Sequence, residues 1–201
     1  MKRRLILMAM TGATIWSIAS DTFAQTFVWK KPPVHDANTG LTFRDLAGFK
    51  FEKATLSAGT GKEPFRYAVD YQPPAPGLFQ ILISDCGTAN VPEGPDSDDI
   101  DTQVNLDIFD LSYQKDKGLL DAVETIDHCV VSIGKGPNAP QFRRVTTFFQ
   151  KNQNQMVLDY YFVGYHGYLI AFRAAFPQER RAAGTQECQR FLAEFARGLA
   201  K

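Results

Sequence analysis

Residues 157–177 read VLDYYFVGYHGYLIAFRAAFP, in which two apolar runs of strand length flank a G-Y-H-G-Y centre. This centre has the composition of a three-residue hairpin loop, in which a type I turn is followed by a left-handed residue. Tyr165-His166-Gly167 fits such a loop, because Gly167 can adopt the left-handed conformation without a steric penalty. The stretch therefore predicts an antiparallel hairpin at the centre of a sheet.

The three-residue loop fixes the register of the hairpin. With Gly164 opposite Tyr168, Asp159 lies directly across from Arg173, and these are the only charged residues on the two strands. A cross-strand pair of opposite charge contributes about 0.2–1 kcal/mol. We therefore expect Asp159 and Arg173 to form a structural pair within the hairpin.

Both faces of this hairpin are apolar, so we expect the sheet to be covered on both sides. A helix from Gly184 or Thr185 to Leu199 is the expected cover on one side. Its apolar face consists of Cys188, Phe191, Leu192, Phe195 and Leu199. The hairpin tip is exposed in this arrangement, so Tyr165 and His166 are candidate partner-binding residues.

The remaining elements follow from alternation, helical spacing and turn residues. Further strands are expected at GFKFEKATLSA (48–58), FRYAVDYQ (65–72), LFQILISDC (78–86), HCVVSIG (128–134) and QFRRVTTFFQK (141–151). A helix is expected over 100–115, and a second helical piece over 118–126. Residues 25–47 contain two prolines and little periodicity, which predicts an extended N-terminal lead-in before a single domain at 48–201.

The order of strands, helix, strands and helix favours an α+β fold with an antiparallel sheet over a doubly wound parallel one. The phrases GFKFEKATL, FRYAVDYQ and GYHGYLIAFRAAFP resemble the PsbP/Mog1-like α/β/α sandwich, and also a class of exported bacterial proteins of unknown function. The resemblance spans about residues 48–199 and implies an antiparallel sheet flanked by helices. It brings no catalytic motif, so it implies a fold and no site residues.

The segment NVPEGPDSDDID (90–101) is acidic and precedes the first expected helix. Asp96, Asp98 and Asp99 lie where capping and the helix dipole favour carboxylates. A calcium loop would need an oxygen ligand at Ile100 and a glycine at Asp101, so weak binding of a divalent ion is the lesser alternative. We predict that these three aspartates belong to a solvated helix entrance that can contact a partner.

The N-terminus reads MKRRLILMAMTGATIWSIASDTFAQ, in which basic residues precede a short apolar run and a polar segment that ends in small residues. This is the pattern of a secretory signal peptide over residues 1–24, cut at Ala24-Gln25 or alternatively at Ala19-Ser20. The run of about 15 residues is shorter than the roughly 20 that span a bilayer. We therefore expect a periplasmic or secreted protein without a membrane span after cleavage.

The whole chain has 22 basic and 22 acidic residues, and loss of residues 1–24 leaves a formal charge near −2. A near-neutral balance without a basic stripe argues against nucleic acid as a partner. Three cysteines remain, and in an oxidising compartment two of them could pair. We favour a structural Cys86–Cys129 disulfide with Cys188 in the core, while a fully reduced state stays open.

Motifs of catalysis or metal binding do not emerge from the sequence, so no catalytic residue, metal ligand or cofactor is assigned. The three histidines, His35, His128 and His166, are widely separated. His128 and Cys129 could serve as ligands or as a catalytic pair, but neighbours on a strand point to opposite faces. Enzymatic activity is therefore left open but not favoured.

These observations favour a non-catalytic exported binding or accessory protein whose partner is a periplasmic or secreted protein. A specific version is an immunity or inhibitor protein that neutralises an effector delivered into the periplasm. The rivals are a small hydrolase whose residues meet only in three dimensions, and a carrier of a small ligand. The sequence does not indicate an oligomeric state.

Overall fold

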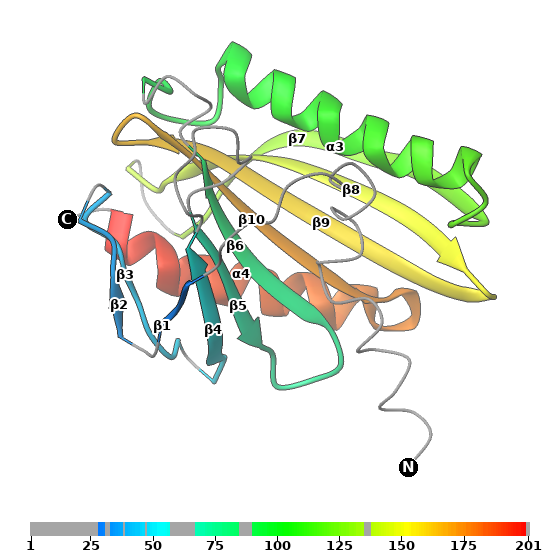
Figure 1. Ribbon diagram of the computed structural model, residues 1–201, viewed down its shortest axis with the longest axis horizontal. Coiled ribbons are helices and arrows are strands. Elements are labelled where there is room, and N and C mark those ends of the chain that lie inside the picture. Colours follow the sequence, from blue (N-terminus) through cyan, green and yellow to red (C-terminus); the bar gives the residue numbers. More distant parts are fainter. Residues whose placement is uncertain are drawn as a thin grey trace.

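The computed structural model describes residues 28–30, 33–37, 39–46, 48–56, 67–84, 90–134 and 138–199. Within these ranges, one antiparallel sheet of eight strands has the order β1-β4-β5-β6-β10-β9-β8-β7 (Figure 1). Its strands are β1 (Val28–Lys30), β4 (Lys50–Leu56), β5 (Tyr67–Gln72), β6 (Leu78–Ser84), β7 (Ala122–Ser132), β8 (Gln141–Lys151), β9 (Asn154–Tyr165) and β10 (Tyr168–Pro177). The last strand of the chain thus lies in the interior of the sheet, between β6 and β9.

The other elements cover this sheet or extend it. A two-stranded sheet consists of β2 (Val34–His35) and β3 (Thr42–Phe43). The helices are α3 (Asp98–Asp116) and α4 (Arg181–Leu199), and a 3₁₀ turn, η1 (Gln178–Arg180), precedes α4. Figure 1 shows α3 and α4 on opposite faces of the sheet, which confirms the predicted α+β class and its α/β/α arrangement.

The α4 face of the sheet is packed with aromatic rings around Phe191. Its ring centroid lies 4.9 Å from Tyr71, 5.0 Å from Phe49 and 4.9 Å from Phe172. At Gly184 a Cβ atom would stand 2.5 Å from the ring of Phe176, so only glycine lets the start of α4 approach the sheet so closely. The face predicted for the last helix is confirmed, since Cys188, Phe191, Leu192 and Phe195 are buried.

The opposite face is covered by α3, which connects β6 near the middle of the sheet to β7 at its edge. Ile100, Val104 and Leu111 of α3 pack with Tyr160 and Phe162 of β9 in a second hydrophobic cluster. Successive residues of β9 point to opposite faces of the sheet, so this one strand contributes side chains to both hydrophobic cores. This alternation explains why the stretch quoted first is almost continuously apolar.

The hairpin itself forms, but the predicted register was wrong by one residue. Tyr165 pairs with Tyr168, so the turn contains only His166 and Gly167. Both residues have positive φ, 52° and 79°, as a two-residue type I′ turn requires. Histidine is one of the few residues other than glycine that tolerates this conformation, and the shorter turn is therefore possible.

Three other expectations change or gain detail. Residues 118–126 were expected to be helical, but the chain turns after α3 and enters β7 at Ala122. The last helix, expected to begin at Gly184 or Thr185, begins at Arg181 and directly follows the 3₁₀ turn at Gln178–Arg180. The lead-in at 25–47 contributes β1, which pairs with β4, as well as β2 and β3.

Candidate functional site

Two segments that are far apart in the sequence meet at one end of the sheet: the loop at 90–96 and the β9–β10 turn. The backbone N–H of Val91 donates to the carbonyl of Gly167 at 3.0 Å, and Gly94 and Gly164 exchange backbone hydrogen bonds of 3.0 and 2.7 Å. The backbone N–H of His166 donates to Glu93 Oε1 at 2.7 Å. The acidic loop and the hairpin tip therefore form one continuous surface, here called the tip surface: Pro92, Glu93, Asp96, Tyr165 and His166.

Gly164 makes this contact possible. A Cβ atom at this position would lie 1.7 Å from the carbonyl oxygen of Pro92. No side chain can occupy that space, so residue 164 must be glycine for the loop to lie against the strand. The sequence marks the position only as a glycine at the end of an apolar run.

Tyr165 and His166 have a fixed arrangement at the exposed end of the turn. Their rings stack with centroids 4.0 Å apart and an interplanar angle of 13°. His166 is exposed and Tyr165 is half-buried. Burial, and to a lesser degree the carboxylate of Glu93, raises the pKa of Tyr165.

The predicted aspartates lie beside this turn, at the start of α3. Ser97 is the N-cap and accepts a hydrogen bond of 3.2 Å from the backbone N–H of Ile100, while Asp98 and Asp99 lie in the first turn. Asp96 forms an ion pair with Arg143 of β8. The same arginine lies 3.5 Å from Asp101 and 3.2 Å from His128 Nε2, so it ties the loop and α3 to the sheet.

Outside these predicted residues, α3 carries an exposed apolar row. Leu106, Phe109 and Tyr113 are 55 %, 67 % and 38 % exposed. They follow each other at helical spacings of three and four residues, on the side of the helix that faces away from Ile100, Val104 and Leu111. Helical periodicity is visible in the sequence for both rows, but it does not show which row faces the core.

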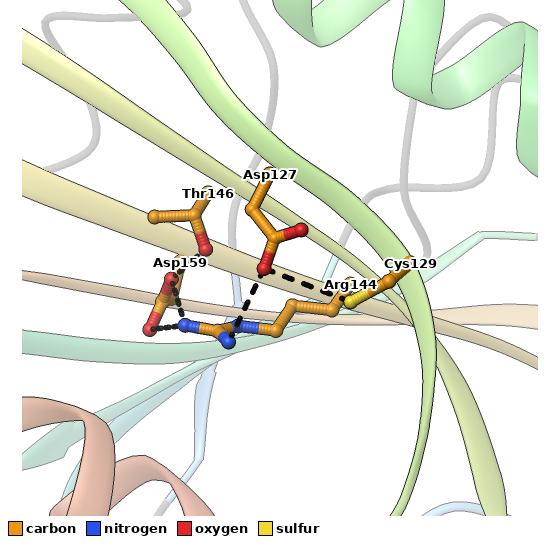
Figure 2. A network of polar contacts seen from close by, with 5 residues as sticks. All are labelled: Asp127, Cys129, Arg144, Thr146 and Asp159. Carbon is orange, nitrogen blue, oxygen red and sulfur yellow. Dashed lines mark hydrogen bonds and ion pairs between the residues drawn. The ribbon is translucent and has the colours of Figure 1, made fainter.

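The face under α4 contains a separate polar network (Figure 2). Arg144 donates to both carboxylate oxygens of Asp159, at 3.1 and 3.2 Å, and lies 3.6 Å from Asp127. Thr146 donates to Asp159 at 2.5 Å. Asp159 is fully buried, so its charge is balanced by Arg144 and not, as predicted, by Arg173.

Arg173 lies on the other face of the sheet, because the corrected register places it opposite Tyr160 and not opposite Asp159. Its guanidinium forms a hydrogen bond with Tyr160 and faces Asp107 and Asp110 of α3. Burial raises the pKa of Asp107 to about 6, which the hydrogen bond from Gln103 and the charge of Arg173 oppose. The two residues predicted as one pair thus belong to two different networks.

The cysteine prediction also changes. Cys129 has a free thiol, so the expected disulfide with Cys86 is not formed in the structure, and Cys86 itself lies outside the described residues. The Cys129 thiol donates to Asp127 Oδ2 at 3.7 Å. Burial and the negative charge of Asp127 raise the pKa of this thiol, which makes it a poor nucleophile.

The three histidines lie in different surroundings. His35 Nδ1 is 3.1 Å from Thr42 Oγ1, His128 contacts Arg143, and His166 lies in the turn. Across the described ranges, no group of three or more His, Cys, Asp or Glu residues is placed to hold a metal ion. No described helix is long and apolar enough to cross a membrane.

No protein-family model matches the sequence, and no curated protein matches it either. Among solved structures, the chain is similar to the solution structure of cyanobacterial PsbP (CyanoP) from Synechocystis sp. PCC 6803. The match has a TM-score of 0.48 and 10 % sequence identity, and it covers 87 % of this chain and 94 % of the other. A match of this TM-score and identity carries no argument about the fold or the function of this chain.

Proposed function

We propose that this chain is a non-catalytic accessory protein that is exported and binds another protein through the tip surface. The observation that carries the proposal is the fixed contact between the 90–96 loop and the β9–β10 turn. Four hydrogen bonds join Val91, Glu93, Gly94 and the turn, so the exposed groups do not have to be ordered on binding. Preorganisation of this kind favours affinity, because little conformational entropy is lost.

The chemistry of the surface fits a protein partner. Tyr165 and His166 present stacked rings with polar edges, and Glu93 and Asp96 present carboxylates beside them. Aromatic side chains with a polar edge are enriched at protein interfaces, because they bury area and still form hydrogen bonds. A hydrolase is the less favoured function, because His35, His128 and His166 lie in separate surroundings and the Cys129 thiol donates to Asp127 and not to a histidine.

The test is affinity capture from the native host with residues 25–201 as bait. The double variant Tyr165→Ser/His166→Ser should lose an exported protein that the wild-type bait enriches. The matched control is Gln186→Ser/Gln189→Ser, which changes two exposed residues of α4 on the other side of the sheet. Equal capture by the tip variant and the wild type would refute the tip surface as the binding site.

Export has its own measurement. The host's own protein should begin at Gln25, or at Ser20 if the alternative cleavage site is used. Export would be contradicted if the protein in the exported fraction still began at Met1, or if the protein were absent from that fraction.

A further inference from the structure

The outward face of α3 has the features of a binding surface separate from the tip surface. Phe109 is two-thirds exposed, and Leu106 and Tyr113 flank it at positions that share one side of the helix. These three residues are here called the α3 stripe. They make up most of the large apolar side chains that are exposed among the described residues, the others being Leu119 and Val130. Single exposed apolar residues are ordinary, whereas a contiguous row points to an interface.

The α3 stripe is not needed to hold the helix on the sheet. The opposite side of α3 packs on the sheet through Ile100, Val104 and Leu111, which are 0 %, 2 % and 2 % exposed. A surface helix with one buried face normally has polar residues on the other side. Apolar residues at Leu106 and Phe109 therefore serve something outside the described core.

The two aromatic rings of the stripe lie against each other. The rings of Phe109 and Tyr113 stack with centroids 6.5 Å apart, and Lys117 Nζ lies 5.3 Å from the centroid of the Tyr113 ring. Large aromatic side chains with restricted motion make good anchors, because binding costs them little rotamer entropy. The spacing of three and four residues matches the pattern by which helices contact an apolar partner.

Charge indicates which partner this face can accept. The N-terminal end of α3 carries Asp98, Asp99 and Asp101, and the tip surface adds Glu93 and Asp96 next to it. Arg143 pairs with Asp96 and Asp101, so the acidity of this end rests mainly on Glu93, Asp98 and Asp99. The C-terminal end is more balanced, because Lys115 and Lys117 flank Asp116. An anionic membrane, or a second copy whose α3 runs parallel, would bring negative charge against the acidic end, and either contact is repulsive. A second copy in antiparallel orientation would bring Lys115 and Lys117 there, but together with Asp116, so it complements the acidic end less fully than a basic segment.

We propose that the α3 stripe binds a basic amphipathic segment of a partner protein, with apolar side chains on Leu106, Phe109 and Tyr113 and cationic side chains at the acidic end of the helix. The inference rests on the proposed protein-binding function and specifies the chemistry of the partner. It concerns a different surface from the tip, so the two can succeed or fail separately.

The experiment uses residues 25–201 and a fluorescently labelled helical peptide of leucine and lysine, about 18 residues long and so about as long as α3. Fluorescence anisotropy should detect binding of this peptide. A peptide with the same leucine positions and glutamate in place of lysine should bind at least about tenfold more weakly, because its charges meet those of Asp98 and Asp99.

Two double variants locate the contact, and two single variants serve as controls. Leu106→Ser/Phe109→Ser should weaken binding of the leucine–lysine peptide about tenfold or more, as expected for an aromatic anchor. Asp98→Asn/Asp99→Asn should weaken it less and should reduce its dependence on salt. Val130→Ser removes an exposed apolar side chain from β7, and Asn105→Ser changes a polar residue on the exposed side of α3; neither control should alter the affinity.

Several outcomes would overturn the inference. They are no binding of the leucine–lysine peptide, equal binding of the glutamate peptide, and unchanged affinity in Leu106→Ser/Phe109→Ser.

Self-association that Leu106→Ser/Phe109→Ser abolishes would identify a second copy as the occupant, and stripe-dependent binding to vesicles of anionic phospholipid would identify a membrane. Loss of host-protein capture in the tip variant, with normal capture by the stripe variant, would leave the proposed function standing and remove only this inference.

Discussion

Arg144 is the residue on which the buried charge of the sheet depends. Its guanidinium binds both oxygens of Asp159, which is fully buried, and lies 3.6 Å from the more exposed Asp127. An unpaired buried carboxylate costs several kcal/mol, because the protein interior solvates it poorly. The ion pair is therefore a condition for packing β8 and β9 under α4.

Arg144→Leu should lower the free energy of unfolding by about 3–5 kcal/mol, because it leaves Asp159 buried without its cation. Adding Asp159→Asn should recover a large part of that loss, and urea titration measures both effects. A double-mutant cycle that combines Asp159→Asn with Arg173→Leu should give a coupling free energy below about 0.5 kcal/mol, since Arg173 lies on the other face of the sheet. Stronger coupling of Asp159 to Arg173 than to Arg144 would contradict the observed register.

At the scale of elements, the key contact is the one between the 90–96 loop and the β9–β10 hairpin. It joins the connection before α3 to the tip of the central hairpin, and it depends on the missing side chain at Gly164. Because α3 starts at Asp98, directly after this loop, the same contact also fixes where the helix begins. The same contact thus holds both the tip surface and the N-terminus of α3 in place.

Gly164→Ala should detach the loop, because its Cβ would overlap the carbonyl of Pro92. Hydrogen exchange of the Val91 and Gly94 amides should accelerate about tenfold or more, while most of the sheet stays protected. Gly198→Ala is the matched control: Gly198 lies in α4 with open space around its Cβ, so this change should leave exchange unaltered and stabilise the helix slightly. Unchanged exchange at Val91 and Gly94 would show that the loop does not depend on Gly164.

At the scale of the whole molecule, the sheet separates two cores, and α3 closes one of them with charged residues on its inner side. Asp107 and Asp110 face Arg173 from α3, and burial raises the pKa of both carboxyl groups. Between the ordinary value of an aspartate and about 6, the folded state therefore binds more protons than the unfolded state. The free energy of unfolding consequently falls as pH rises through this window.

Asp107→Asn should remove much of that slope and raise the free energy of unfolding at neutral pH by about 1–2 kcal/mol. Asparagine can still accept the hydrogen bond from Gln103, so the contact within α3 is kept. Chemical unfolding at a series of pH values measures the effect, with Asp116→Asn as a control that removes an exposed charge from the same helix. A variant that is less stable than the wild type, or one whose free energy of unfolding keeps the full dependence on pH, would contradict this. It would show that the attraction between Arg173 and the Asp107 carboxylate outweighs the cost of burying that carboxylate.

The sequence by itself determined the fold class and the kind of most main elements, residues 118–126 being the exception. Alternation along 48–58 and 65–72 predicted strands, the apolar face of the last helix predicted its packing, and the aspartates after Pro95 indicated the start of α3. These properties are local: the side-chain period is two in a strand and 3.6 in a helix, and capping involves neighbours in the chain. The position of Tyr165 and His166 at the hairpin tip also followed from the turn composition.

The tertiary structure alone decided the register, the charge partners and the exposed face of α3. A turn one residue shorter than expected moved Arg173 to the other side of the sheet, because each shift of one residue reverses the face of every side chain. The partner of Asp159 is Arg144, which lies on a neighbouring strand and not on the one predicted. Leu106, Phe109 and Tyr113 repeat with the same helical spacing as the buried row, so only the docking of α3 shows which row meets the sheet and which remains exposed.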